Sequence, residues 1–319
     1  MRYRYWADRC RDDMTQIPLI DYQDDVATVR TAIIEACEDY GIFNLVNHPL
    51  ANEINRNALS ESASFFTQSM VEKQAVVRTL NNPWGYYDRE LTKQRRDRKE
   101  IFDFGPGFSI PWPAGRQHFR RTMELYTDRC RLLSLDLLDG LSHALGSERS
   151  ALRKAFDPAH SSFTRLNYYP VNDALANTDA PTAGPLGISE HTDAGGLTVL
   201  QQGDVAGLQI YHNGWQDVNP VKDALTINIG DMLQVWSNDR FKAPLHRVRA
   251  SSGNDRYSIV FFLNPAMECV VEPLASAVKA GDYPHYRALP WEEFRELRAQ
   301  GDYGDYGEEI QITHYRSNS

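Results

Sequence analysis

Three residues of metal-binding type are spaced so that strands could bring them together: His191, Asp193 and His246. In an extended strand, residues two apart point to the same face, so His191 and Asp193 could both reach one ion. His246 lies in a later apolar segment and could complete the set. Two histidines and one carboxylate form a facial triad, which suits iron(II) and leaves coordination positions open for a substrate and oxygen. Zinc accepts the same ligands, so these residues alone predict a metal site with two candidate metals.

The segment Arg256-Tyr-Ser258 favours iron over zinc. If residues 251–255 form the loop of a hairpin, residue 246 faces residue 260, and His246, Arg256 and Ser258 share the inward face. An arginine inside an apolar barrel is costly unless an anion pairs with it, and a guanidinium beside a hydroxyl suits a carboxylate. We therefore expect a dicarboxylate that also chelates the metal, a description that 2-oxoglutarate fits. The alternative is that Arg256 is a solvent-exposed strand residue, as most arginines are.

A weaker clue comes from Asn167-Tyr-Tyr-Pro170, in a strand that would open the barrel. Asn167 and Tyr169 are two apart, so they share a face and could hydrogen-bond the other end of the same acid. Tyrosines in strands also serve as packing residues, so this pair supports the prediction without deciding it.

The elements that must position these residues change character along the chain. Apolar residues recur at helical spacing over 26–37, 54–65 and 119–141, with short strands expected at 17–20 and 42–46, and loop signals gather in 81–116. From residue 163 the period becomes two, which predicts strands at 163–169, 188–192, 197–201, 207–211, 225–229, 232–236, 245–250 and 256–263. Many short strands without intervening helices favour a jelly roll. The predicted fold class is therefore mainly β, with flanking helices on the outer face of the sheet.

We expect one integrated domain over residues 1–319, because no low-complexity linker divides the chain. Within it, the helix-rich region would span 16–150 and the jelly-roll core 160–270. A C-terminal extension would span 271–319 and include a helix near 290–299.

The bulk composition narrows the function classes. The chain has 319 residues, 42% of them apolar and 24% charged, and a net charge of −9, which disfavours nucleic acid and anionic membranes as partners. The four cysteines, Cys10, Cys37, Cys130 and Cys269, form no CxxC pair, and those in helical patterns are expected to be buried. The sequence shows neither a signal peptide nor a membrane-spanning apolar run, so a cytoplasmic protein is expected.

Taken in order, these motifs resemble the isopenicillin N synthase-like family of iron(II)/2-oxoglutarate-dependent dioxygenases. The resemblance runs from about residue 16 to residue 300. In the second half it rests on Asn167-Tyr-Tyr-Pro170, His191-Thr-Asp-Ala-Gly-Gly-Leu-Thr-Val-Leu200, Asn228-Ile-Gly-Asp231, Trp236-Ser-Asn238, His246-Arg-Val248 and Arg256-Tyr-Ser258. In the first half it rests on Ile17-Pro-Leu-Ile-Asp21, Tyr40-Gly-Ile-Phe-Asn-Leu-Val-Asn-His48, Phe65-Phe66, Glu72-Lys73, Gly85-Tyr86 and Lys99-Glu100.

The resemblance implies a distorted double-stranded β-helix, with iron(II) on His191, Asp193 and His246. It places the C5 carboxylate of 2-oxoglutarate on Arg256 and Ser258. Dioxygen would be the other cosubstrate. The implied reaction oxidises a small molecule, expected to be a secondary metabolite, and releases succinate and carbon dioxide. Hydroxylation is the default outcome, while desaturation or cyclisation would use the same triad. The alternatives are an iron oxidase of the same family that does not use 2-oxoglutarate, and a non-catalytic binding protein on this fold.

The family's substrate pocket maps onto Arg165, Phe262, Asn264, Phe104 and Asp103. The two phenylalanines suggest a partly apolar or aromatic substrate, and Arg165 could pair with an acidic group. The alternative is that both phenylalanines simply pack.

Two positions depart from the family pattern. Asp239 stands where the family usually has Gly, and Ala243 where it commonly has Ser. Both precede His246, so we expect them to alter the shape of this loop and not the ligand set. None of the remaining histidines is expected to be a ligand. His48 lies in the Asn-His turn of the family and is expected to be structural, and the others lack a spaced carboxylate partner: His118, His143, His160, His212, His285 and His314.

Overall fold

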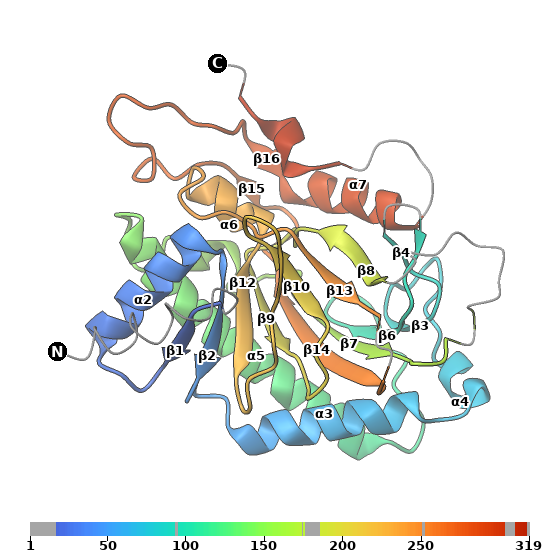
Figure 1. Cartoon of the computed structure of the whole chain (residues 1–319). Coiled ribbons are helices and arrows are strands. Elements are labelled where there is room, and N and C mark those ends of the chain that lie inside the picture. Colours follow the sequence, from blue (N-terminus) through green and yellow to red (C-terminus); the bar gives the residue numbers. More distant parts are fainter. Residues whose placement is uncertain are drawn as a thin grey trace.

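Two β-sheets face each other at the centre of the molecule, with helices around them (Figure 1). The structure, a computed structural model, describes residues 17–92, 95–173, 175, 186–250, 253–303 and 310–317. Cys10 lies outside the described residues. Cys37 and Cys130 are buried thiols within helices, as predicted. The fold is mainly β with flanking helices, and its core is a jelly roll.

The larger sheet contains eight strands, and the smaller sheet contains four. In spatial order the larger one comprises β1 (Leu19–Asp21), β2 (Ile42–Val46), β12 (Leu225–Ile229), β9 (Leu197–Gln201), β14 (Arg256–Leu263), β7 (Phe163–Tyr169), β6 (Glu100–Phe104) and β3 (Gly85–Tyr87). The smaller one comprises β11 (Trp215–Asp217), β10 (Leu208–Tyr211), β13 (His246–Arg249) and β8 (Leu186–His191). The strands β7, β9, β12 and β14 have the predicted bounds.

Alternation along β7 and β14 separates a cavity face from a packing face. The two strands pair antiparallel, with Asn167 opposite Ser258 and Tyr169 opposite Arg256. These residues face the cavity between the sheets. On the opposite face of the same strands, Leu166, Ile259 and Phe261 are fully buried against the helices.

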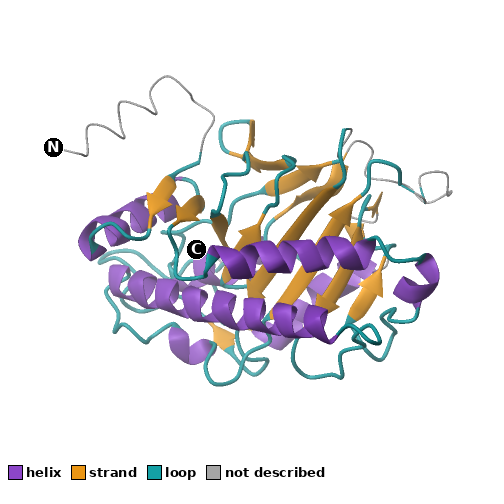
Figure 2. Ribbon diagram, turned by 90° about the horizontal axis from the view of Figure 1, so that it is seen from below, coloured by secondary structure: helices purple, strands orange, loops and turns teal. Residues whose placement is uncertain are grey.

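Two helices cover the outer face of the larger sheet, α3 (Asn52–Phe66) and α5 (Gln117–Ala144). Figure 2 shows them side by side across the strands. Thr127 of α5 and Thr164 of β7 share a hydrogen bond of 2.6 Å, and Phe66 of α3 stacks on Tyr168 at 5.5 Å between ring centroids. This arrangement confirms the prediction that the helices pack on the outer face of the sheet.

The helix α2 (Val26–Asp39) contains the apolar pattern found at 26–37. The Asp25 side chain accepts a hydrogen bond of 3.0 Å from the Thr28 backbone N–H, which caps the first turn. Beyond the last turn, Gly41 has a φ of +69°, and a Cβ there would lie 2.1 Å from the Lys242 carbonyl oxygen. Only glycine fits this position, which brings the start of β2 against the loop that precedes His246.

The prediction of a strand at 232–236 is wrong, because these residues belong to the short helix α6 (Asp231–Trp236). Five consecutive residues are too few to distinguish a period of 3.6 from a period of two. The helix is also buried on nearly all sides, so it shows no polar face that would reveal its period.

The hairpin expected between 245–250 and 256–263 is also wrong. Strand β13 pairs with β8 and β10, whereas β14 pairs with β7 and β9, in the other sheet. A short polar connection containing glycine and asparagine can turn back within one sheet or cross to the facing sheet, and its composition is the same in both cases.

The region 81–116, expected to be rich in loops, also contributes strands. In addition to β3 and β6 it contains the pair β4 (Leu91–Thr92) and β5 (Arg95–Arg96). The remaining elements are α4 (Met70–Gln74), η1 (Arg153–Ala155), β15 (Val270–Val271), β16 (Leu289–Pro290), α7 (Trp291–Tyr303) and η2 (Ile312–Tyr315). Helix α7 is the one expected near 290–299.

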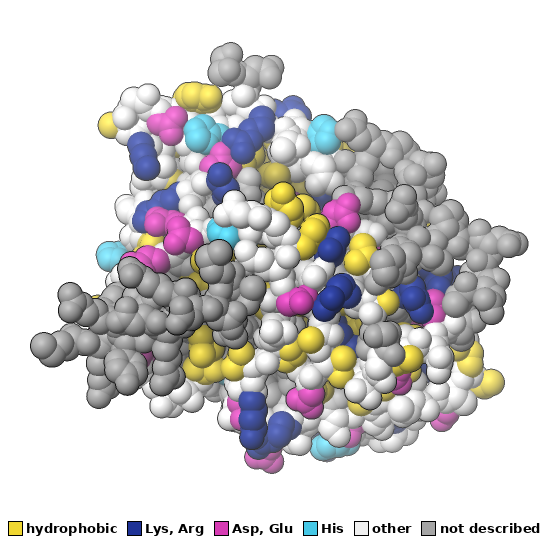
Figure 3. All heavy atoms as spheres, viewed as in Figure 1, with side chains coloured by type: hydrophobic (Ala, Val, Ile, Leu, Met, Phe, Trp, Pro, Cys, Tyr) yellow, Lys and Arg dark blue, Asp and Glu magenta, His cyan; other side chains and the backbone are white. Residues whose placement is uncertain are grey.

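The surface mixes charges of both signs. On the face shown in Figure 3, Lys and Arg side chains lie among Asp and Glu side chains and are not gathered by sign. Within the described residues, none of the helices combines the length and apolar character needed to cross a bilayer.

Candidate metal centre

The three predicted ligands lie together at one end of the cavity. His191 ends β8, Asp193 follows that strand, and His246 begins β13 directly opposite His191. The Asp193 Oδ1 atom lies 3.8 Å from His191 Nε2 and 3.7 Å from His246 Nε2. One ligand atom from each residue lies within 4.8 Å of the others, so a single ion could contact all three. Among the described residues this is the one such group of three or more His, Cys, Asp or Glu.

Hydrogen bonds orient each ligand. His191 Nδ1 lies 2.8 Å from the Ser189 carbonyl oxygen, and His246 Nδ1 lies 3.1 Å from that of Pro244. A carbonyl only accepts, so each Nδ1 carries the hydrogen and each Nε2 presents a lone pair toward Asp193.

The carboxylate of Asp193 is held through its other oxygen. Asp193 Oδ2 accepts hydrogen bonds of 2.6 Å from Thr198 Oγ1 and from Asn228 Nδ2, which leaves Oδ1 directed at the histidines. Sequence reasoning assigned no role to Thr198 or Asn228. Both lie within motifs that support the family resemblance, and that is the signal that could have identified them.

The charge states of the triad suit a cation. Burial, together with the neighbouring His246, lowers the pKa of His191 to about 3, so its imidazole is neutral at physiological pH. Burial alone would raise the pKa of Asp193. The two histidines and the hydrogen bonds from Thr198 and Asn228 outweigh burial and hold this pKa below its usual value. A neutral imidazole and an ionised carboxylate are the forms that coordinate a metal.

Arg256 lies deep in the same cavity, on the facing sheet. The predicted neighbourhood is therefore present, although it arises from two facing sheets and not from a hairpin. Arg256 is 1% exposed, and its Nε donates to the Val205 carbonyl oxygen at 3.1 Å. Its NH1 atom lies 3.5 Å from Ser258 Oγ, and its guanidinium lies 4.8 Å from the centre of the Tyr169 ring.

No carboxylate among the described residues pairs with Arg256, and burial lowers its pKa. A buried cation without a counter-charge is costly, so the site is built to receive an anion. The backbone leaves room for this side chain at Gly207, where a Cβ would lie 3.3 Å from Arg256 Cδ. A dicarboxylate with one end on the metal and the other on Arg256 fits this arrangement.

Asn167 and Tyr169 stand beside this arginine, whereas the sequence led us to expect them at the other end of the bound acid. They lie opposite Ser258 and Arg256 on the neighbouring strand, and both line the cavity. The Asn167 Oδ1 atom is buried and has no hydrogen-bond partner among the described residues. An orphaned buried amide is expected where a polar ligand completes the site.

The cavity, of about 320 Å³, continues from the metal centre to a second end. Four of the five predicted pocket residues line it: Arg165, Phe262, Asn264 and Asp103. Phe104 does not line it, and its ring instead packs 5.0 Å from that of Trp112. Successive strand residues point to opposite faces, so Asp103 and Phe104 cannot both face the cavity.

Arg165 is not available to pair with an acidic substrate group, because two carboxylates of the protein already bind it. Its Nε and NH2 atoms donate to the two oxygens of Asp103 at 2.8 and 2.7 Å. Its NH1 atom donates to Glu90 at 2.9 Å. Sequence reasoning missed Glu90 and its neighbour Lys99, because the charged stretch before β6 has the composition of a solvated loop.

Helix α7 contributes a further group of cavity residues that sequence reasoning missed. Trp291, Arg295 and Arg298 line the cavity. Arg298 NH2 donates at 2.9 Å to the carbonyl oxygen of Thr192, which stands between two of the predicted ligands. These residues lie about a hundred positions after His191 in the sequence. Nothing in their local sequence pattern indicates that they pack near the metal ligands.

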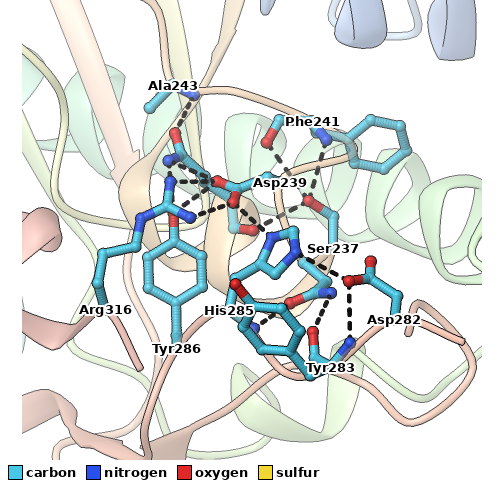
Figure 4. Close-up of polar contacts among 11 residues, drawn as sticks. Ser237, Asp239, Phe241, Ala243, Asp282, Tyr283, His285, Tyr286 and Arg316 are labelled. Carbon is cyan, nitrogen blue, oxygen red and sulfur yellow. Dashed lines mark hydrogen bonds and ion pairs between the residues drawn. The ribbon is translucent and has the colours of Figure 1, made fainter. Parts of the chain in front are cut away.

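The two departures from the family pattern lie in one network (Figure 4). Asp239, at a φ of +66°, accepts hydrogen bonds from Tyr286 OH at 2.6 Å and from both terminal nitrogens of Arg316. Its Oδ2 atom lies 2.8 Å from His285 Nδ1. His285 therefore has carboxylate partners, contrary to expectation. An aspartate tolerates this left-handed backbone better than most residues do, and here it gains four partners that glycine would lack.

The same network reaches the loop before His246. Gln234 donates to Asp239 at 3.1 Å and accepts from the Ala243 backbone N–H at 2.9 Å. Ala243 precedes Pro244, whose carbonyl oxygen accepts the hydrogen bond from His246 Nδ1. The altered positions thus shape the loop, as expected, and leave the ligand set intact.

Comparisons with known proteins agree with this geometry. Residues 160–265 match the 2OG-Fe(II) oxygenase superfamily, and residues 17–122 match the family described as non-haem dioxygenase in morphine synthesis N-terminal. Gibberellin 20 oxidase 1-B of Triticum aestivum is 33% identical over 279 residues, which cover 83% of this chain and 74% of the relative. The 1-aminocyclopropane-1-carboxylate oxidase of Musa acuminata is 33% identical over 274 residues, covering 82% and 86%.

Solved structures are similar along most of the chain. JOX2 in complex with 2OG, Fe and JA has a TM-score of 0.81 and 29% identity, covering 95% of this chain and 90% of JOX2. A full-length Neurospora crassa protein in complex with alpha-KG and thymine has a TM-score of 0.76 and 27% identity, covering 87% and 94%. This chain belongs to the 2OG-Fe(II) oxygenase superfamily and is a 2-oxoglutarate-dependent non-haem iron dioxygenase, with iron, 2-oxoglutarate and dioxygen as its cofactor and cosubstrates.

Proposed function

We propose that this enzyme hydroxylates a small molecule at a C–H bond, with His191, Asp193 and His246 as the iron ligands. The observation that carries the proposal is a buried triad that shares one cavity with a buried arginine lacking a carboxylate partner among the described residues. Dioxygen would be the oxidant, bound iron(II) would activate it, and 2-oxoglutarate would be oxidised to succinate and carbon dioxide together with the substrate.

The chain's own residues bind and orient the cosubstrate. Arg256 and Ser258 would hold the C5 carboxylate, the arginine through its fork of N–H groups and the serine through its hydroxyl. The Tyr169 ring, 4.8 Å from the guanidinium carbon, fixes the plane of that fork. Asn167, beside Ser258, would hydrogen-bond the ketoacid on its other side. Because these groups are buried, the acid is held with little competition from water.

The substrate would bind at the second end of the cavity, next to the metal. Arg165, Phe262, Asn264 and Asp103 line that end, and we propose them as substrate-contacting residues. Small molecules appear in the names of the relatives, including gibberellin, JA and thymine. We propose a small secondary metabolite as the substrate class and hydroxylation as the outcome, because desaturation and cyclisation require further control of the substrate after the same hydrogen removal.

The test begins without oxygen. Iron(II) and 2-oxoglutarate added anaerobically should give the weak visible charge-transfer band of a chelated ketoacid. His246→Ala should abolish the band, and Arg256→Ala should require on the order of a hundredfold more ketoacid to produce it. Arg249→Ala is the matched control, because Arg249 is an exposed arginine on the same strand as His246. A wild-type protein that gives no band would contradict the proposal.

A second measurement separates the proposed reaction from its alternative. One succinate should form for each substrate molecule oxidised when oxygen is admitted. Substrate oxidation without succinate would identify an iron oxidase that does not use 2-oxoglutarate.

A further inference from the structure

A chain of alternating charges runs along one wall of the cavity, from Asp103 at the second end toward Lys99, whose neighbour Glu100 pairs with Tyr168 of β7. In order it is Asp103, Arg165, Glu90, Lys99 and Asp97. The Lys99 Nζ atom lies 2.6 Å from Glu90 Oε2 and 3.1 Å from Asp97 Oδ2. Arg165 joins Glu90 to Asp103 through contacts of 2.7 to 2.9 Å. Four of these residues line the cavity, so a bound substrate would meet this wall directly.

The wall is largely buried, and the cations described in it are equal in number to the carboxylates. The side chains of Asp97, Lys99, Glu90 and Asp103 are at most 7% exposed, and that of Arg165 is 16% exposed. Arg78, 3.9 Å from Glu90, supplies a third cation, which matches the three carboxylates. Burial alone would raise the pKa of Glu90, but Arg165, Lys99 and Arg78 outweigh it and hold that pKa well below its usual value. Glu90 is therefore ionised.

This balance decides which ligands the wall can accept. A carboxylate substrate would approach the oxygens of Asp103 and Glu90, and like charges repel strongly where water is excluded. Its possible cationic partners, Arg165 and Lys99, already bind two carboxylates each. A neutral polar molecule meets no such penalty. It can donate to the remaining lone pairs of the carboxylates and accept from the ammonium group of Lys99.

Aromatic rings form the neighbouring wall. Phe163 stacks on Phe262 at 4.8 Å between ring centroids, and Trp84 lies 5.8 Å from Phe163. All three residues line the cavity. This surface suits a flat or apolar body, while the charged wall suits a polar edge that contains both a donor and an acceptor.

We propose that the substrate is an uncharged molecule that carries an amide-like edge, such as an amide, imide or lactam. This edge would bind the wall formed by Asp103, Arg165, Glu90 and Lys99, and the body would lie on Phe163 and Phe262. The inference rests on the proposed function, since it describes the substrate end of the same cavity. The competing anchor for an anion is Arg295 of α7, which is partly exposed and lines the cavity.

The test uses matched pairs of small ligands and requires no turnover. The full chain is loaded with Zn(II) and saturated with 2-oxoglutarate, and ligand binding is measured by saturation-transfer NMR. The probes are benzamide against benzoate and indole-3-acetamide against indole-3-acetate. Replacing Zn(II) with Mn(II) identifies the ligands that bind near the metal, because their signals broaden. We expect the amide of each pair to bind near the metal at least tenfold more tightly than the carboxylate.

Two variants assign the preference to this wall. Asp103→Asn removes one negative charge, while Glu90 continues to pair with Arg165. In this variant we expect the carboxylates to bind at least fivefold more tightly than in wild type. Arg295→Gln should leave the preference for amides unchanged.

Equal or tighter binding of the carboxylates by the wild type would overturn the inference, as would the absence of amide binding near the metal. A carboxylate preference that disappears in Arg295→Gln would assign substrate recognition to α7 instead. These outcomes are separate from the proposed function, which fails only if the anaerobic band or the succinate is absent.

Discussion

Two arginines that line the cavity, Arg256 fully buried and Arg165 mostly buried, differ in what surrounds them. Arg256 is 1% exposed and has no carboxylate partner among the described residues, whereas Arg165 is bound by both Asp103 and Glu90. Arg256 needs an external anion as its counter-charge, so we call its surroundings the incomplete end of the cavity. Arg165 already has its counter-charges within the protein, so we call its surroundings the complete end. The difference shows that a buried arginine indicates an anion site only when the protein itself supplies no counter-charge.

The largest expected effect is a loss of stability when a charge is removed from the complete end, around Arg165. Glu90→Gln removes the charge that joins Arg165 to Lys99 and leaves both cations poorly compensated in a buried site. The free energy of unfolding should fall by about 3 to 5 kcal/mol, measured by urea denaturation. The affinity of the folded variant for 2-oxoglutarate should stay within about twofold of wild type, because Arg256 is untouched.

Glu148→Gln is the matched control for that variant, since the ion pair of Glu148 with Lys154 is exposed. It should leave stability unchanged. A loss in Glu90→Gln no larger than in this control would show that the charged chain does not stabilise the fold.

The opposite result is expected at the incomplete end. Arg256→Met should weaken 2-oxoglutarate binding by on the order of a hundredfold, about 3 kcal/mol, in a calorimetric titration of the metal-loaded protein. The unfolding free energy of the ligand-free protein should stay the same or rise, because an uncompensated buried charge is removed. A large loss of stability would mean that Arg256 has an internal partner and that the two ends are alike.

A smaller effect is expected at the metal. Thr198→Val removes one of the two hydrogen bonds that hold Asp193 Oδ2, so metal affinity should fall about tenfold. Thr226→Val is the control. Thr226 is a buried threonine of the same sheet, and its hydroxyl donates a hydrogen bond to Asn44, which is not a metal ligand. Competition with a chromophoric chelator would measure both. An equal loss in the two variants would show that metal affinity reflects the sheet as a whole and not the support of Asp193.

The smallest expected effect is the pH dependence of the stability that Glu90 contributes at the complete end. The pKa of Glu90 is lower in the folded protein than its unfolded value of 4.5, so its contribution is fully present above that value and is lost as the pH falls below it. Between pH 7 and pH 4 the stability difference between wild type and Glu90→Gln should shrink by about 0.8 kcal/mol. Urea denaturation of both proteins at the two pH values measures this difference. A difference that grows on acidification would contradict an ionised Glu90.

The sequence was sufficient for the parts of the site that depend on spacing along one strand. Arg256 and Ser258 lie two apart on β14, which has the predicted bounds, and His191, at the end of β8, lies two residues before Asp193. The same rule of alternation excludes Phe104 once Asp103 faces the cavity. A consistent application of that rule would have removed Phe104 from the predicted pocket.

The sequence was insufficient where the outcome depends on contacts between distant segments. Arg165 and Arg256 both alternate inward on a strand, and only the arrival of Glu90 and Asp103 from another region distinguishes them. The connection before Arg256 could not reveal that it crosses between sheets. The helix at Asp231–Trp236 is too short for its period to show. Each failure concerns a partner or a direction that local composition does not encode.

The arrangement around α7 has a consequence for how such enzymes can diversify. The metal ligands are fixed by strand pairing, while the substrate end is assembled from four segments that are distant in the chain, around residues 83–103, 163–165, 262–264 and 291–298. Insertions, exchanges or drift in the first or last segment can therefore change what is oxidised without disturbing the oxidising centre. In evolutionary terms, reactivity and selectivity are inherited on separate stretches of sequence, so a descendant can acquire a new substrate while it retains its ancestor's chemistry.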